Sequence, residues 1–293
     1  MPISGSRTSP EAVFLTPADA RRMEAGEEYG ALRYAQALLA QKRDMGIAWE
    51  EFCGGHLVFV ARRSLVGRAH ALGFAGEVTP EQIQHVEDFY FQREADAQID
   101  VCPYAHPSLF EAVNRRGFQV AEFNQTLARW IVPGEVFAAR CSDFSVRVVR
   151  GNEAQEWSAV LAQVFFEDHA PQFGKFFLPW VNEKNALCLG AFIDGKMVGG
   201  AGGLIVPEHK MAGFFGAATL PAFRGRGIQS ALMLERLRIV QQAGCDLAVT
   251  LTMPGTTSQR NVERAGFRTA YTKVVVVKRH ASSPEAIQVH YSE

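Results

Sequence analysis

The chain has 293 residues with 30 basic and 31 acidic side chains, so its formal net charge of −1 excludes a strong field that would attract nucleic acid or an anionic membrane. This length is enough for two domains, each with its own core. The five cysteines are widely spaced without a Cys-x-x-Cys pair, and we find no signal peptide and no apolar run of about 20 residues, so we expect a soluble, reduced, cytoplasmic protein.

The first half of the sequence alternates between helical and strand patterns. In chain order it predicts a helix, two strands, a second helix and a third strand, at residues 31–43, 56–60, 66–73, 80–93 and 99–102. A further helical segment ends at Gly117, and strand-like residues follow from Phe123.

An internal repeat accounts for the length of the chain. The segment from Leu109 to Arg129 echoes the segment from Asn261 to Lys278, and the glycines of their Gly-Phe pairs lie 149 residues apart (266 − 117). The repeat predicts two tandem domains, residues 1–138 and 139–293, joined near residues 133–142.

The most informative motif is an apolar run that ends in a glycine-rich turn and opens a helix. It reads Ala217-Ala218-Thr219-Leu220-Pro221-Ala222-Phe223-Arg224-Gly225-Arg226-Gly227-Ile228-Gln229. The two glycines allow successive amides to face an anion, the helix start adds unpaired N–H donors, and the arginines add charge. The motif therefore predicts a phosphate-bearing cofactor. A P-loop would need Lys followed by Ser or Thr, and a dinucleotide fingerprint would need a third glycine at Ser230, so both are set aside.

The residues after this motif continue the alternation of helix and strand. The helix that opens at Ile228 has two apolar faces and should end at Gly244, before a buried strand at 247–251. A capping box from Thr256 to Gln259 predicts a short helix that ends at Gly266, and a last strand covers 274–277.

Together these features resemble motif A, the closing helix, the Gly-Phe turn and the final strand of the GCN5-related N-acetyltransferases (GNAT), which bind acyl-coenzyme A. The resemblance implies an α/β protein of two tandem acyl-CoA N-acyltransferase folds, each a mixed, mostly antiparallel sheet flanked by helices. It also implies acetyl-CoA as co-substrate, with pantetheine held by Ala217, Ala218 and Thr219, pyrophosphate by Arg224, Gly225, Arg226, Gly227, Ile228 and Gln229, and the far side by Ser258 and Asn261. Gln229 replaces the Gly or Ala of the family pattern, and its side chain either crowds the pyrophosphate or donates a hydrogen bond to it.

The first half lacks an equivalent of this motif. Where it should fall, the segment from Gly76 to Glu81 offers one glycine and two carboxylates, which would repel a pyrophosphate. We therefore expect a degenerate copy that either serves as a packing scaffold or helps to form the acceptor pocket.

Acetyl transfer to an amine needs a proton acceptor, donors for the oxyanion and an acid for the leaving thiolate. Val262 stands where the family usually has its tyrosine acid, and the strand before the motif carries no carboxylate. Glu167 or His169, in the loop expected over the acceptor site, is a candidate base, and Tyr271 is a candidate acid. The alternatives are solvated loop side chains and a half-buried strand tyrosine.

Two further groups bear on the expected site. Backbone amides near Ala218 to Leu220 are candidate oxyanion donors. The aromatic residues Phe173, Phe176, Phe177 and Trp180 have helical spacing, which is first typical of a packing stripe and second of an apolar pocket wall.

The sequence predicts an N-acetyltransferase that acts on an amine of a small molecule or peptide by direct transfer. The alternative is a non-catalytic acyl-CoA-binding regulatory or scaffold protein, because the usual acid and base are missing. No His-x-x-x-His or Cys/His cluster is present, so no metal is predicted, and neither nucleic acid nor a membrane is an expected partner. A homodimer is compatible with the sequence.

Overall fold

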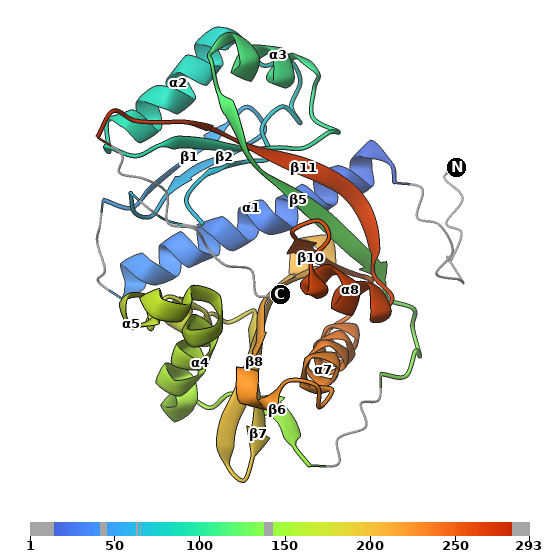
Figure 1. Cartoon of the computed structure of the whole chain (residues 1–293). Helices are drawn as coiled ribbons and strands as arrows, with labels where there is room; N and C mark the ends of the chain where they lie inside the picture. Colours follow the sequence, from blue (N-terminus) through green and yellow to red (C-terminus); the bar gives the residue numbers. More distant parts are fainter. Residues whose placement is uncertain (1–14, 42–45, 63, 65, 138–142, 283–293) are drawn as a thin grey trace.

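The computed structural model describes residues 15–41, 46–62, 64, 66–137 and 143–282 (Figure 1). The helices in this part of the chain are α1 (Pro17–Ala40), α2 (Pro80–Phe91), α3 (Ser108–Arg115), α4 (Ala154–Phe166), α5 (Ala170–Phe173), α6 (Leu178–Val181), α7 (Ile228–Gln242) and α8 (Thr257–Arg264). The strands are β1 (Ala48–Phe52), β2 (Gly55–Phe59), β3 (Ala69–His70), β4 (Ala97–Val101), β5 (Gln119–Trp130), β6 (Ser145–Val148), β7 (Ala186–Ile193), β8 (Lys196–Val206), β9 (Met211–Thr219), β10 (Leu247–Thr252) and β11 (Arg268–Lys278).

The described strands form one mixed sheet in the order β1-β2-β3-β4-β11-β5-β10-β9-β8-β7-β6. Two pairs are parallel, β3 with β4 and β9 with β10, and the other neighbours are antiparallel. The mostly antiparallel sheet with flanking helices confirms the predicted fold class.

The last strand of each repeat lies in the part of the sheet formed by the other repeat. β5 of the first half pairs with β10 on one side and β11 on the other, while β11 of the second half also pairs with β4 (Figure 1). The strands that follow the two Gly-Phe pairs therefore exchange places, and the two repeats share one sheet. The connection expected to join the two domains includes residues 138–142, which lie outside the described residues.

Helices cover both faces of this sheet. On β2, Val58 belongs to a cluster with α1 and α4, whereas its neighbour Leu57 packs with α2 and α3. On β8, the space above Gly200 is filled by Trp157 of α4, and the space above Gly199 is bounded by α7. Because successive strand residues point to opposite faces, α1 and α4 cover one face, and α2, α3 and α7 cover the other.

Helix α1 connects the two halves of the sheet. It begins at a capping box in which the Thr16 side chain accepts from the Asp19 amide and the Asp19 carboxylate accepts from the Thr16 amide. It crosses the middle of the molecule and contacts β2 and β3 of the first half and β8 and β9 of the second (Figure 1). A Cβ on Gly26 would lie 2.5 Å from Cε of Met211, so a larger residue here would force the Met211 side chain to move.

Most predicted elements are present, although their ends differ. The first helix starts at Pro17 instead of residue 31, and the strand predicted at 66–73 is reduced to Ala69–His70. The prediction that the α7 helix is buried on two sides is confirmed, because Leu232 packs in one buried cluster and Leu237 in another.

Cys53, Cys102, Cys188 and Cys245 are free thiols, and Cys141 lies outside the described residues. Burial raises the pKa of the Cys188 thiol to about 12, which keeps it protonated at neutral pH. Within the described ranges, no helix is both long and apolar enough to cross a bilayer.

The exchanged strands predict that the two halves unfold together. Leu127 of β5 is fully buried in a cluster with second-half residues such as Leu237 and Phe267. We expect Leu127→Ala to lower the free energy of unfolding by about 3 kcal/mol and to shift one common transition. Urea unfolding followed by tryptophan fluorescence and far-UV circular dichroism measures both.

The matched control is Val120→Ala on the same strand, where the side chain is 59% exposed and the expected change is within about 0.5 kcal/mol. Two separate transitions, of which Leu127→Ala moves only one, would contradict a shared folding unit.

Candidate active site

The glycine-rich turn forms an open cradle at the start of α7. Gly225 and Gly227 both have a φ of 81°, in the left-handed region that favours glycine, and a Cβ on either would meet no heavy atom within 4 Å. Gly227 is the N-cap of α7, and no described side chain caps this helix, so its first N–H groups can bind an anion. Arg224 and Arg226 are exposed on the same turn, and Arg226 also lies 3.0 Å from Asp143. The cradle fits a pyrophosphate.

β9 and β10 separate next to this cradle. Their parallel pairing ends at Phe214 and Thr250, where the Thr250 hydroxyl donates to the Phe214 carbonyl oxygen over 3.0 Å. Beyond this point, among the described strands, β9 pairs only with β8 and continues to Thr219. One edge of the Ala217–Thr219 backbone is therefore open to the amide groups of a ligand.

A β-bulge lies on β9 at the same position. Gly216 and Ala217 together stand opposite Ala201 of β8, and Gly216 has a φ of 58°. The amide of Leu220, at the end of the predicted oxyanion segment, already donates to the Val198 carbonyl oxygen over 2.9 Å. The bulge, which leaves one residue of β9 out of the ladder, is the better source of donors for an oxyanion.

The remaining predicted cofactor residues lie on neighbouring elements. Ile228 is buried at the first position of α7, and Gln229 is half-buried at the second. Ser258 is exposed and Asn261 is half-buried on α8, which contacts α7. The predicted set therefore occupies the end of β9, the start of α7 and the adjacent α8.

In the first half, the helix start and the gap between the parallel strands are both occupied by hydrogen bonds within the chain. At the start of α2, the Thr79 hydroxyl accepts from the Gln82 amide, and the Gln82 side chain accepts from the Thr79 amide. The loop after β3 is tied to the loop after β4, because the His106 amide donates to the Gly73 carbonyl oxygen over 2.9 Å. The helix start is capped and the gap between the parallel strands is bridged, which explains physically why this copy is degenerate.

A cavity of about 340 Å³ lies between the two halves, close to the separation of β9 and β10. Its aromatic lining consists of Phe165, Phe166, Phe176, Phe177, Trp180, Phe214 and Phe215. Its charged lining consists of Glu27, Arg68, His70, Asp100, Glu122 and Lys273. The aromatic stripe predicted from the sequence is therefore both core packing and, through three of its four members, a cavity wall. The charged groups come from the first half and from the exchanged strand β11.

Lys273 of β11 is the centre of a buried ion cluster. Its side chain is 1% exposed, and its ammonium group lies 3.6 Å from Glu24 and also contacts Glu27, both on α1. Burial alone would lower the pKa of Lys273, but Asp100, Glu24 and Glu27 raise it, so the side chain stays charged. A cation from the second half is thus held by carboxylates of the first.

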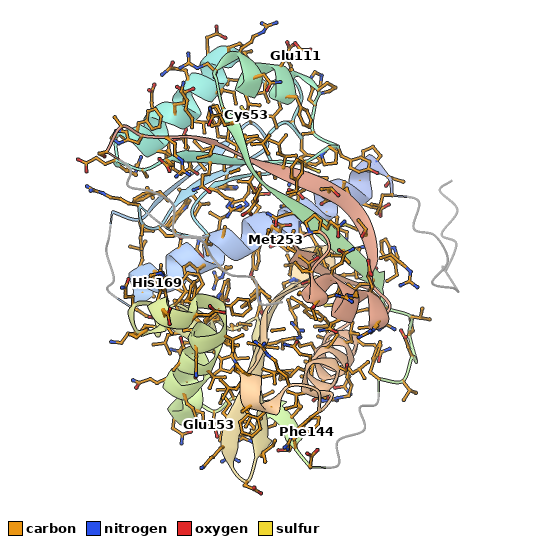
Figure 2. All side chains as sticks on the ribbon, in the orientation of Figure 1. Cys53, Glu111, Phe144, Glu153, His169 and Met253 are labelled. Carbon is orange, nitrogen blue, oxygen red and sulfur yellow. The ribbon has the colours of Figure 1, made fainter. Side chains whose placement is uncertain are left out.

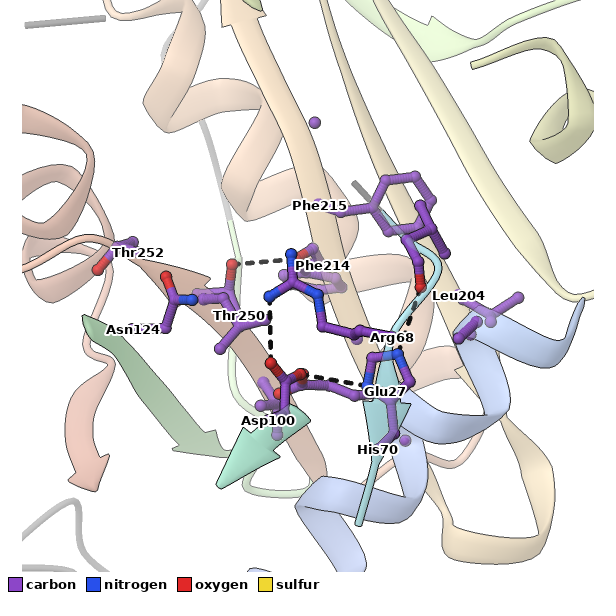
Figure 3. Close-up of a pocket in the computed structure, with 18 of the residues that line it drawn as sticks. Glu27, Arg68, His70, Asp100, Asn124, Leu204, Phe214, Phe215, Thr250 and Thr252 are labelled. Carbon is purple, nitrogen blue, oxygen red and sulfur yellow. Dashed lines mark hydrogen bonds and ion pairs between the residues drawn. The ribbon is translucent and has the colours of Figure 1, made fainter. Parts of the chain in front are cut away.

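Asp100 of β4 links this lysine to two further basic groups. Its carboxylate lies 3.3 Å from the Lys273 ammonium group. It also lies 3.1 Å from Arg68 and 3.2 Å from His70, and dashed lines in Figure 3 mark these two contacts. Burial favours the protonated form, yet Lys273, Arg68 and His70 hold the pKa of Asp100 well below its usual range. Asp100 is therefore a fixed anion.

Glu27 behaves differently from Asp100. Burial raises its pKa to about 7 against the attraction of Lys273, and repulsion by Glu24 and Asp100 adds to the rise. A carboxyl group that exchanges its proton near neutral pH can act as a general base.

Glu27, His70 and Asp100 also bring three possible metal-ligand atoms within 4.8 Å of one another. The ammonium group of Lys273 contacts two of these residues, so a cation already belongs to the cluster. We therefore interpret the group as an ion cluster and assign no metal to it.

The candidate acid and bases from the sequence lie outside the cavity lining. Glu167 and His169 are exposed, and Figure 2 shows His169 at the outer side of α5, whereas Met253, which lines the cavity, lies in the middle of the molecule. The Tyr271 hydroxyl is buried and donates to Glu24 over 2.6 Å, and burial together with Glu24 raises its pKa. We therefore reassign Tyr271 from the leaving-group acid to a residue that positions Glu24.

The sequence reasoning missed the charged residues of the cavity. Asp100 is a charge within an apolar strand, and Lys273 directly precedes the run of valines in β11, so both carried a signal of buried pairing. Glu27 lies in an acidic, glycine-containing segment before the predicted helix, so nothing in the sequence indicated that its side chain is buried and paired. The pairing across the two halves was not visible in either half alone.

Comparison with known proteins agrees with this geometry. Residues 153–267 match the model of the acetyltransferase (GNAT) family, and no curated protein sequence matches the chain. A GCN5-related N-acetyltransferase from Kribbella flavida is similar in structure, with a TM-score of 0.60, 16% identity, and coverage of 84% of this chain and 95% of that one. A tandem GNAT protein from the clavulanic acid biosynthesis pathway has a TM-score of 0.59 and 12% identity and covers 92% of this chain and 98% of its own. At these identities, the two structures are evidence for the fold.

The matched segment contains the cradle, the separating strands and α8. Residues 153–267 match the GNAT family, and the fold of the whole chain is similar to that of a tandem GNAT protein.

The raised pKa of Glu27 predicts a pH-dependent stability. A group whose pKa rises from 4.5 to about 7 on folding binds its proton more tightly in the folded state. Its contribution to the free energy of unfolding is therefore fully present below pH 4.5 and is lost as the pH rises through 7. Glu27→Gln is neutral at every pH and lacks this loss. Relative to the native protein, the variant should gain about 2–3 kcal/mol between pH 5 and pH 8. Urea unfolding at both pH values measures this, and an unchanged difference between variant and native would contradict the shift.

Proposed function

We propose that this protein is an N-acetyltransferase that transfers the acetyl group of acetyl-CoA directly to an amine. The observation that carries the proposal is the open cradle of Gly225 and Gly227 next to the unpaired edge of β9. A diphosphate bound at the helix start would extend its pantetheine arm along this edge. The location, as suggested by the sequence, is the cytoplasm.

The cofactor supplies an activated thioester, and the residues of this chain would bind and orient it. Arg224 to Gln229 would hold the pyrophosphate, Ala217 to Thr219 the pantetheine, and Ser258 with Asn261 the far side. Main-chain donors at the Gly216 bulge would stabilise the oxyanion. The steric freedom at both cradle glycines supports this assignment.

The acceptor amine would enter the cavity between the halves. This cavity includes Gly216 of the bulge in its lining, so the acceptor and the acyl group would meet there. The degenerate first half would then complete the acceptor site in place of binding a second cofactor.

The alternative is an acyl-CoA-binding regulatory or scaffold protein without turnover. The missing tyrosine acid and strand carboxylate favoured this reading of the sequence. The cavity favours catalysis, because Glu27 provides a titratable carboxyl group on its surface.

Calorimetric titration with acetyl-CoA tests the cofactor site. Gly227→Glu adds bulk and a negative charge at the start of α7, and we expect it to weaken binding by more than about tenfold, which corresponds to about 1.4 kcal/mol. The control is Gly195→Glu at the β7–β8 turn, which has a similar φ of 78° and equally open surroundings. Equal losses in both variants, or no binding by the native protein, would refute the proposed cofactor site.

A further inference from the structure

The ion cluster of the cavity contains more acidic than basic side chains. Contacts of 3.6 Å or less connect its members. They are the acids Glu24, Glu27, Asp100 and Glu122, and the bases Arg68, Lys273 and His70. With His70 protonated and all four acids ionised, the four acids and three bases give the cluster a net charge of −1. A buried net charge is costly unless a proton or a cation neutralises it.

Two oxygen atoms at the cavity are also unsatisfied. Among the described residues, Oε1 of Glu27 and Oγ1 of Thr252 are buried without a hydrogen-bond partner. Thr252 is 5% exposed and stands at the end of β10, and both residues line the cavity. Buried oxygens of this kind normally accept a hydrogen bond, so a ligand that donates hydrogen bonds would complete them.

The aromatic wall of the cavity disfavours an acceptor that carries a second charged group. Phe166 stacks on Phe173 with ring centroids 4.2 Å apart, and Trp180 packs on Phe215 with centroids 4.7 Å apart, so the aromatic wall is preformed. The volume of about 340 Å³ lies at the lower end of the range for small-molecule sites. An acceptor that fills the cavity would place an apolar body against these rings and its polar end at the cluster.

We infer that the acceptor is a small primary alkyl- or arylalkylamine, whose ammonium group binds at the acidic cluster and whose proton is taken by Glu27. This inference rests on the proposed acetyltransferase function and specifies its substrate class and base. Glu27 is contributed by the first half of the chain, so the degenerate repeat supplies the group that the catalytic half lacks.

Glu27 takes one proton from the ammonium group, the neutral nitrogen attacks the thioester carbonyl, the C–N bond forms and the C–S bond breaks with the electron pair leaving on sulfur. Of the three ammonium protons, one stays on the amide nitrogen, one ends on the thiol of coenzyme A, and one is released to solvent after transfer from Glu27.

The pH dependence follows from the groups around Glu27. Glu24 faces it from α1, Lys273 from β11, Asp100 from β4 and His70 from β3. Arg68, which precedes β3, joins the cluster through Asp100. The base works when it is ionised, so kcat/KM for the amine should rise with pH through an ionisation near 7.

The first experiment compares acceptors that differ by one charge, with release of coenzyme A as the readout. Phenethylamine should exceed phenylalanine in kcat/KM by at least about tenfold, because the added carboxylate faces a cluster with excess negative charge. Hexylamine should exceed 1,6-diaminohexane by a similar factor of about ten, because the second ammonium group would be buried against aromatic rings.

The outcomes separate this inference from the proposed function. Acetyl-CoA binding with transfer only to amino acids or polyamines would overturn the substrate class and leave the acetyltransferase standing. Acetyl-CoA binding without transfer, and without calorimetric binding of phenethylamine, would overturn both the substrate class and the role of Glu27. If acetyl-CoA itself does not bind, the proposed function fails together with the inference.

The second experiment tests Glu27 directly. Glu27→Gln should lower kcat/KM for phenethylamine by about 100-fold at pH 7.5 and abolish the rise near pH 7, with the KM for acetyl-CoA unchanged. The matched control is Glu28→Gln, the next residue of α1, which pairs with Arg21 and His56 and lies outside the cavity lining. Its activity should stay within about twofold of native, with the same pH profile. A Glu27→Gln variant with native activity, or with reduced activity and an unchanged pH profile, would overturn the role of Glu27 as base.

Discussion

The exchange of β5 and β11 is the constraint on which the rest of the structure depends. Because β11 pairs with β4 as well as with β5, it carries Lys273 from the second half to the acidic residues of α1 and β4 in the first. Removing one partner from such a buried group would leave a charge without compensation, which is far more costly than the pair itself is stabilising. The shared sheet and the ion cluster therefore support each other, and the cavity forms where they meet.

Much of the fold could be predicted from the sequence because its signals were local. The 149-residue offset of Gly117 and Gly266 correctly related α3 to α8 and β5 to β11, since a helix stop and the following strand are encoded by neighbouring residues. The start of α1 was missed, although Thr16 and Asp19 form a capping box, because the acidic residues and glycines that follow hide its apolar face. The strand exchange could not be predicted, because the two strands have similar patterns and either position in the sheet satisfies them.

The candidate site likewise has one part that the sequence predicts and one part that it does not. The proposed cofactor cradle lies within one continuous segment, so its residue types and their order were sufficient to propose it, and Gly225 and Gly227 have the positive φ values that such a turn requires. The acceptor cavity is assembled from residues far apart in the chain, such as Glu27 and Lys273. A search for an acid and a base near the motif therefore selected Glu167 and Tyr271, of which one is exposed and the other is buried against Glu24. A charge within an apolar strand signals that it is buried and paired, but a single sequence does not show which distant charge is its partner.

The position of β11 also affects how the chain folds during synthesis. The partner of Val101 in the sheet is Val274, so one edge of β4 stays unpaired until the chain beyond residue 274 has emerged from the ribosome. The first half cannot complete its sheet as an early, independent folding unit, and the open edges of β4 and β5 are exposed to other chains in the meantime. A duplication that ordinarily allows domains to fold one after the other has here produced a single unit of high contact order, whose folding should be slow for its size.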